Sequence, residues 1–382
     1  MFKFISRISA RGASPAHNLY LFQIQPLSSF LEVKSKHKSS NQYSFTVKYL
    51  INSFGFTPEK ALSASRHVKF ETPDKPDSVV ALFKNHGFTR TQISKVIKKF
   101  PSVLVCDAKK TLLPKLQFLN SKGVSSTDVA VIVSTCPHVL KCSLKNVIIP
   151  SFDFFSNLLQ SEEKAVAAIK RYSGIFWVDH QARVTPHIQV LREANVPEAN
   201  IMYLLMKQPR TFMVKIGRFR EVVEEVEKMG FNHLRMSFVS AVHAVRALSK
   251  STWDKKVEAY RKWGLTDDEF LAAFKKYPGC MKVSENKIDE VMDFLVNKTG
   301  WGSSFFVRRP EVVSLSLEKR IVPRNAVYQA LWSKGLITSK DIRLETLLLV
   351  SETQFLEKVL SYQEEAAPEL LKLYKEKLDL AK

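Results

Sequence analysis

The sequence predicts an all-α protein, a solenoid of about eight to nine two-helix units. A proline followed by aliphatic residues recurs at a period near 35 residues, and apolar residues inside each period repeat at helical spacing. With 45% hydrophobic residues, the 382-residue chain is able to build a substantial core. A period of this length is typical of repeat proteins, in which each unit buries its apolar stripe only against its neighbours.

Each unit is anchored on a proline or on the residue that takes its place. The anchors recur at steps of 32 to 36 residues, and they are Pro101, Pro137, Ser173, Pro209, the neighbourhood of Ala244, Pro278 and Pro310. Four residues before these anchors, apart from Ala244, lie Ile97, Val133, Ile169, Leu205, Phe274 and Phe306. Three residues after them lie Leu104, Leu140, Phe176, Phe212, Met281 and Val313. At Ser173 and Ala244, where the proline is absent, we expect looser turns.

These columns predict the structure of one unit. The anchor proline ends a first helix, because its ring clashes with the preceding turn. A second proline 13 residues later fits the first turn of a second helix; it is Pro114, Pro150, Pro186 or Pro323. The second helix ends near a glycine. Thr266 and Glu269 form a capping-box pattern, so Asp267, Asp268 and Glu269 are interpreted as helix-start carboxylates and not as an acid–base pair.

The two ends of the chain differ from the repeats. Residues 1–44 are basic, rich in serine and amphipathic, which predicts an organellar transit peptide and favours the mitochondrion over the chloroplast. A disordered basic arm is the alternative. The solenoid is expected over residues 45–350, and residues 351–382 are predicted to form a C-terminal capping helix.

The charge of the chain predicts a polyanionic partner. Lys and Arg number 58 against 37 Asp and Glu, a formal net charge of +21, which indicates nucleic acid or an anionic membrane surface as the partner. A basic protein with an ordinarily solvated surface is the alternative. No apolar run reaches the ~18 residues of a membrane span, so we expect no membrane partner.

Basic residues keep register with the anchors, which predicts a ladder of phosphate contacts along one groove wall. Beside the anchors lie Lys98, Lys99, Lys170, Arg171, Lys207, Arg210, Lys275, Lys276, Arg308 and Arg309. Further candidates at the starts of second helices are Lys109, Lys110, Arg183, Arg218, Arg220, Lys319, Arg320 and Arg324. Trp253, beside Lys250, Lys255 and Lys256, is the candidate for stacking on a base, although its helical position favours the apolar core.

The sequence offers no convincing catalytic or metal site. It has no Gly-rich phosphate loop, no His-Glu-x-x-His and no nucleophile elbow. Cys136, His138 and Cys142 lack the paired spacing of a zinc site, and His180 and His187 have no ligand partner. We therefore expect a protein without catalytic residues, cofactor or metal, with its four cysteines as thiols.

Five stretches carry a resemblance to a known family: Phe100-Pro-Ser-Val-Leu104, Phe45-Thr-Val-Lys-Tyr-Leu-Ile-Asn52, Glu71-Thr-Pro-Asp-Lys-Pro-Asp-Ser78, Ser249-Lys-Ser-Thr-Trp253 and Ser314-Leu-Ser-Leu-Glu-Lys-Arg320. With them the chain resembles the plant type of the mitochondrial transcription termination factor (mTERF) family. The resemblance covers about residues 45–375. It implies a right-handed α-solenoid of paired helices and short 3₁₀ turns, curved around a basic groove. It also implies a non-catalytic protein, expected here as a monomer.

The same resemblance implies a function in organelle gene expression. The groove is expected to hold double-stranded DNA or RNA, so that the protein regulates or terminates transcription. RNA maturation, such as intron splicing or rRNA processing, is one alternative, and a scaffold for a polymerase or ribosomal partner is another. Tetratricopeptide and pentatricopeptide arrays have similar periods, but two prolines 13 residues apart would interrupt their helices.

Overall fold

The protein is described from a computed structural model, which covers residues 43–177, 179–338, 343–361 and 367–380. Nearly all of the expected transit peptide, residues 1–44, lies outside the described part. The chain divides after Lys141 into two compact units, which are described separately below.

The first unit consists of short helices joined by tight turns. Its α-helices are α2 (Phe45–Phe54), α3 (Pro58–Ser65), α4 (Asp74–Asn85), α5 (Arg90–Lys99), α6 (Leu113–Ser121) and α7 (Ser126–Thr135). Two 3₁₀ turns, η3 (Pro101–Val105) and η5 (Pro137–Lys141), follow α5 and α7, and a π-helical turn, η4 (Ala108–Leu112), leads into α6.

The second unit continues this pattern over the rest of the chain. Its first helices are α9 (Glu162–Arg171), α11 (Glu198–Lys207), α13 (Met236–Ala247), α15 (Asp267–Lys276), α17 (Ser303–Arg308) and α19 (Leu344–Leu349). Its second helices are α8 (Ile149–Leu159), α10 (His180–Glu193), α12 (Ile216–Lys228), α14 (Lys250–Arg261), α16 (Glu285–Asp293), α18 (Val322–Ser333) and α20 (Glu352–Ser361). The 3₁₀ turns are η7 (Ser173–Trp177), η8 (Pro209–Met213), η9 (Pro278–Lys282) and η11 (Pro310–Ser314), and the π turns are η6 (Leu144–Ile148), η10 (Phe294–Lys298) and η12 (Leu317–Ile321).

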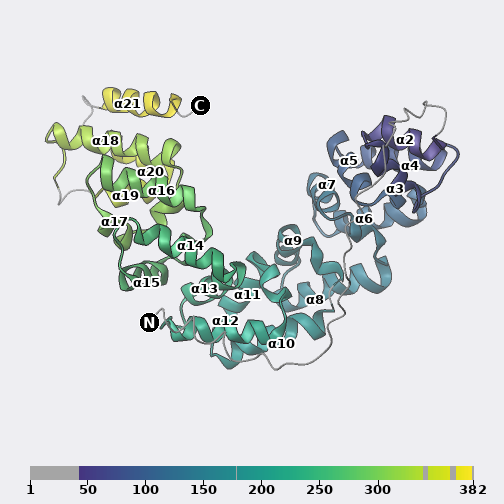
Figure 1. The fold of residues 1–382 in the computed structure, drawn as a ribbon, viewed down its shortest axis with the longest axis horizontal. Coiled ribbons are helices and arrows are strands. Elements are labelled where there is room, and N and C mark those ends of the chain that lie inside the picture. The colour runs from purple at the N-terminus through teal and green to yellow at the C-terminus, as the bar shows by residue number, and fades with distance from the viewer. Residues whose placement is uncertain (1–42, 178, 339–342, 362–366, 381–382) are drawn as a thin grey trace, which may run out of the picture. The chain divides into compact units, whose positions relative to one another are not determined.

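The all-α repeat architecture is confirmed. In chain order, eight helix pairs run from α3–α4 to α17–α18 within the described residues, and α19–α20 adds a ninth. No β-strand occurs in this part of the chain. For residues 351–382 the sequence predicted one capping helix, but the described residues form two, α20 and α21 (Ala367–Asp379). Helix α21 packs along α18 (Figure 1).

The anchor columns form the core, as predicted. The five anchor prolines each begin a 3₁₀ turn, and the first helix before each turn ends two residues earlier. The residues four before and three after the anchors are all at most 2% exposed. Glycines at the ends of second helices take the left-handed conformation, as at Gly123 with φ 81° and Gly264 with φ 83°. Four residues after Pro114 and Pro150, by contrast, Phe118 and Phe154 lie half-buried.

Three of the second prolines, Pro114, Pro150 and Pro323, lie in the first turn of α6, α8 and α18, as predicted, but a helical turn precedes each of them. The segments before Pro114, Pro150 and Pro323 already coil as π turns, whose amides bond five residues back, as Leu112 does to Asp107 at 3.3 Å. Pro186 lies inside α10. A proline within a helix would clash with the carbonyl four residues before it, and a wider turn relieves that clash. The prolines therefore follow a helical turn that is already formed.

The two units without an anchor proline do not have looser turns. Ser173 begins a 3₁₀ turn of the usual five residues. At Ala244 no turn forms, because a residue with an N–H continues the helix; α13 therefore runs on to Ala247 and α14 begins at Lys250. The expectation of looser turns was therefore wrong at both positions. The longer helix α13 also changes the charged surface described below.

Candidate nucleic-acid interface

The first helices of neighbouring repeats end on a common edge. In the first unit α5 packs on α7, and the ammonium of Lys99 donates to the carbonyl of Thr135, at the end of α7, at 2.8 Å. In the second unit α9, α11, α13, α15 and α17 pack in succession, and Lys276 reaches the carbonyl of Val307 at 2.9 Å. We call the last turns of these helices, with the 3₁₀ turns that follow them, the turn edge of each unit.

Most of the predicted ladder residues lie exposed on the turn edge. The exposed ones are Lys98, Lys99, Lys170, Arg171, Arg210, Lys276, Arg308 and Arg309, while Lys207 and Lys275 are half-buried. Their positions at helix C-termini complement the negative end of each helix dipole. Among the described residues, Lys98, Arg171, Lys207 and Arg309 form no ion pair with a carboxylate, whereas Arg308 lies 3.4 Å from Glu345. The turn edge therefore carries positive charge that the protein does little to neutralise.

Some ladder residues also hold neighbouring repeats together. Lys99 and Lys276 do so through the carbonyl bonds described above. The Arg210 guanidinium lies 5.8 Å from the centre of the Tyr172 ring, the residue just before the preceding anchor. In the first unit, Lys141 lies 4.6 Å from the ring of Phe100 in the same way. Stacking fixes these cations in place while leaving their charge available.

The carboxylates gather at the other ends of the helices. Ion pairs there join Arg192 to Glu198 at 2.7 Å and Arg261 to Asp267 at 2.6 Å, where a second helix ends and the next first helix begins. Arg218 and Arg220, which were candidates for phosphate contact, are paired with glutamates in α12 and α10. Along α9, α11 and α15, acidic residues thus lie in the first turn and basic residues in the last turn, so the turn edge receives the basic ones.

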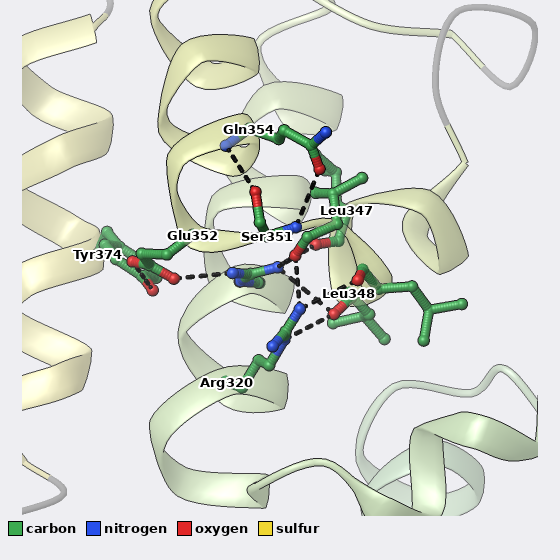
Figure 2. A network of polar contacts seen from close by, with 10 residues as sticks. Arg320, Leu347, Leu348, Ser351, Glu352, Gln354 and Tyr374 are labelled. Carbon is green, nitrogen blue, oxygen red and sulfur yellow. Dashed lines mark hydrogen bonds and ion pairs between the residues drawn. The ribbon is translucent and has the colours of Figure 1, made fainter. Parts of the chain in front are cut away.

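Arg320 and Arg324 have a structural role, which corrects the prediction that they contact nucleic acid. Arg324 is fully buried and donates at 2.7 Å to the carbonyls of Leu347 and Val350 and to the carboxylate of Glu352. Arg320 is half-buried and donates to the carbonyl of Leu348 at 2.8 Å, as Figure 2 shows. The two arginines therefore cap the carbonyls at the end of α19. Of the three candidates Lys319, Arg320 and Arg324, only the exposed Lys319 remains in the candidate interface.

The same network fastens the C-terminal helices. Tyr374 of α21 donates to the second oxygen of Glu352 at 2.7 Å (Figure 2). Burial and this bond to a carboxylate raise the pKa of Tyr374 to about 12. The carboxyl of Glu352 is partly buried, which raises its pKa, but the bonds from Tyr374 and Arg324 outweigh this and lower it.

Arg324 belongs to a column of buried donors. Lys115, His187 and Arg324 each lie 14 residues after an anchor, and each bonds to a main-chain carbonyl of the following repeat. Lys256 does the same to Val283 in the unit that lacks an anchor. These side chains satisfy carbonyls that would otherwise be left without donors at the 3₁₀ turns and helix ends. The basic residues of the chain thus have two roles. The exposed ones charge the turn edge, and the buried ones donate to carbonyls of the following repeat.

Trp253 lies in the core, which corrects its assignment as a stacking residue. It is 7% exposed, and its ring lies 5.2 Å from Phe274 and 6.4 Å from Phe270 in edge-on contacts. Among the described residues, the exposed large aromatic side chains are Phe45, at 40%, Tyr203, at 44%, and Trp332, at 47%. A base could stack on any of these without unfolding a repeat.

The described residues contain no group of three or more His, Cys, Asp and Glu side chains placed to hold a metal ion. Cys106, Cys136, Cys142 and Cys280 form no disulfide in the described part of the chain. His180 packs on the ring of Phe154, and burial lowers the pKa of His180 and of His187 below its usual value. No helix in the described part is long and apolar enough to cross a membrane.

Several cations of the turn edge were not among the predicted candidates. Lys141 and Lys282 lie four residues after Pro137 and Pro278. Comparing the residues four positions after each anchor would therefore have revealed both of them. Arg246 and His243 lie on α13, in the unit without an anchor. They were missed because the missing proline was interpreted as a loose turn, whereas the helix continues and carries both side chains to the edge.

These features define a class of protein: an α-helical repeat protein with a cationic edge. A sequence profile of the mTERF family matches residues 80–290 and 236–356. The chain belongs to the mTERF family.

Two relatives, both from Arabidopsis thaliana, bear names of this family. Transcription termination factor MTERF15, mitochondrial, is 23% identical over 288 residues, which are 74% of this chain and 55% of the relative. Transcription termination factor MTERF8, chloroplastic, is 20% identical over 195 residues, which are 51% of this chain and 38% of the relative. The chain thus spans about half or less of the length of the relatives it matches.

Proposed function

We propose that this protein acts in an organelle, where it binds nucleic acid along the turn edge and regulates transcription. Membership of the mTERF family and the names of its mitochondrial and chloroplastic relatives support the organellar setting. The amphipathic, acid-poor N-terminal residues favour the mitochondrion.

The observation that carries the proposal is the poorly neutralised charge on successive first helices of the second unit. Arg171, Lys207, Arg210 and Arg309 belong to repeats that stack on one another, so their charges recur from unit to unit. A nucleic-acid backbone also carries charge at regular intervals, and binding releases its condensed counterions. Contacts of this kind fix the position of the strand and give affinity without reading sequence.

The test is the salt dependence of binding by the full chain, measured with duplex DNA and with RNA. The triple variant Arg171→Gln, Lys207→Gln, Arg309→Gln should lower the slope of log Kd against log salt by roughly one unit for each cation that no longer neutralises a phosphate. The matched control is Lys228→Gln, Lys262→Gln, Lys298→Gln, because it removes the same charge from lysines away from the turn edge, each within 3.6 Å of a carboxylate. We expect the control to keep the slope of the natural chain.

Two results would contradict the proposal. The first is a flat salt dependence of the natural chain with both nucleic acids. The second is an equal reduction of the slope in the two triple variants, because that would attribute binding to net charge and not to the turn edge. Recovery of a protein partner after nuclease treatment, with no nucleic acid bound, would favour the scaffold function instead.

A further inference from the structure

Helix α13 takes the place of a 3₁₀ turn and brings charged side chains between the turns on either side. It packs against η8 of the preceding repeat and against η9 of the following one. His243 and Arg246 lie three residues apart, so they project from one face of its last turns. The missing anchor proline is what allows the helix to extend this far.

Three cations meet around this face. The Arg246 guanidinium donates to the carbonyl of Arg210 in η8, and Arg210 is held on the ring of Tyr172. Lys282, the last residue of η9, is exposed and acts electrostatically on His243 from the other side. In the described part of the chain no carboxylate pairs with Arg210, Arg246 or Lys282. We call these three residues the α13 cluster.

The α13 cluster contains a hydrogen-bond donor without an acceptor. The Nε atom of Arg246 is buried and has no hydrogen-bond acceptor among the described residues. Burial lowers the pKa of Arg246, and the charge of Arg210 lowers it further. Both effects make the charged form of Arg246 less stable than it would be in water. An anion would satisfy the free donor and offset the repulsion at once.

His243 lies inside the field of this cluster. Its Nδ1 atom is 2.9 Å from the hydroxyl of the fully buried Thr211. Burial, then Lys282 and then Arg246 lower the pKa of His243 to about 4, so the ring is neutral at neutral pH. These two are the charged groups that act on it, Lys282 from η9 and Arg246 from its own helix. An anion among the cations would weaken that field and make protonation of His243 easier.

We propose that the α13 cluster binds a phosphate group, supplied by the backbone of the bound nucleic acid. This inference rests on the proposed function and adds to it one defined contact point. A phosphate matches the chemistry because its oxygens accept charge-assisted hydrogen bonds from guanidinium and ammonium donors. The C-terminus of α13 carries a partial negative charge of roughly one half, which repels an anion. The three positive charges of the cluster outweigh this repulsion.

The site should be tested by NMR on the full chain with labelled histidines, assigning His243 by its loss in His243→Gln. Titrations would use inorganic phosphate in one arm and a short duplex DNA or RNA in the other. With nucleic acid bound, the pKa of His243 should rise by at least about one unit, because the cationic field is offset. The double variant Arg210→Gln, Lys282→Gln should abolish this shift and weaken binding several-fold. Both side chains are exposed, and neither donates a hydrogen bond within the described structure, so the fold should persist.

The matched control is Lys228→Gln, Lys262→Gln, which removes the same charge elsewhere and should leave the response of His243 intact. Nucleic acid that binds with a steep salt dependence but leaves His243 unchanged would overturn the inference and spare the proposed function. A response to inorganic phosphate alone would overturn the assignment to the backbone. If nucleic acid does not bind the natural chain at all, both proposals fail.

Discussion

His243 is a residue at which local structure and pH are linked. In an unfolded chain its pKa would return to about 6.5, whereas in the folded protein it is lowered to about 4. The folded pKa is the lower one, so the associated stability is complete above about pH 6.5. It is lost as the pH falls toward 4, because the unfolded state binds the proton more readily.

We therefore predict that acid destabilises the protein partly through His243. Because this side chain is partly exposed, the loss between pH 7 and pH 4.5 should be about 1–2 kcal/mol, less than the full shift would give. Urea unfolding followed by circular dichroism at several pH values would measure it. The variant His243→Gln should show a shallower pH dependence, and His67→Gln, which removes an exposed histidine, should not. Equal pH profiles for His243→Gln and the natural chain would refute the linkage.

At the scale of one element, Trp253 shows how a second helix is attached to its neighbours. Its ring joins α14 to the phenylalanines of α15, and its burial follows from the apolar column in which it lies. The sequence placed this tryptophan near lysines, which suggested a nucleic-acid contact. Helical periodicity, and not the nature of the adjacent residues, decides which way such a side chain points.

Trp253→Ala should therefore destabilise the protein by about 3–5 kcal/mol, because it leaves a large cavity between two helices. Trp332→Ala is the matched control, since it removes the same side chain from a position that is 47% exposed. It should change stability by no more than about 0.5 kcal/mol. Thermal unfolding of both variants provides the comparison, and similar losses of stability in the two would show that Trp253 is not the core residue described here.

The helices themselves were largely predictable, and the π turns were not. Anchor prolines and the Thr266 capping box mark helix ends through local chemistry, so they work in any repeat. The π turns depend on where the second helix starts. Asp107, Ser143, Asp179 and Ser316 cap these helices, each seven residues before its proline. This column of caps was visible in the sequence, and it would have placed each helix start before its proline.

For the whole molecule, the sequence predicted that basic residues follow the repeat, but not which of them face solvent. Arg308 and Arg324 are both arginines near one anchor, yet one is exposed and the other fully buried. The difference comes from the next repeat, whose carbonyls at Leu347 and Val350 require donors. Contacts between units, which a single period of sequence does not contain, therefore decide the function of each basic residue.

This dependence on neighbours leads to a prediction for the array as a whole. In Arg324→Gln the carbonyl of Leu347 and the carboxylate of Glu352 lose a donor, and the carbonyl of Val350 keeps only the bond from Arg320, which should cost about 3 kcal/mol. Because each repeat contacts only its neighbours, the destabilisation should stay local. Hydrogen exchange should accelerate in α18, α19 and α20 and remain unchanged in the helices of the first unit. Lys319→Gln, at an exposed position in the preceding turn, should leave exchange as it is in the natural chain. Faster exchange throughout the chain would instead show that the repeats unfold together.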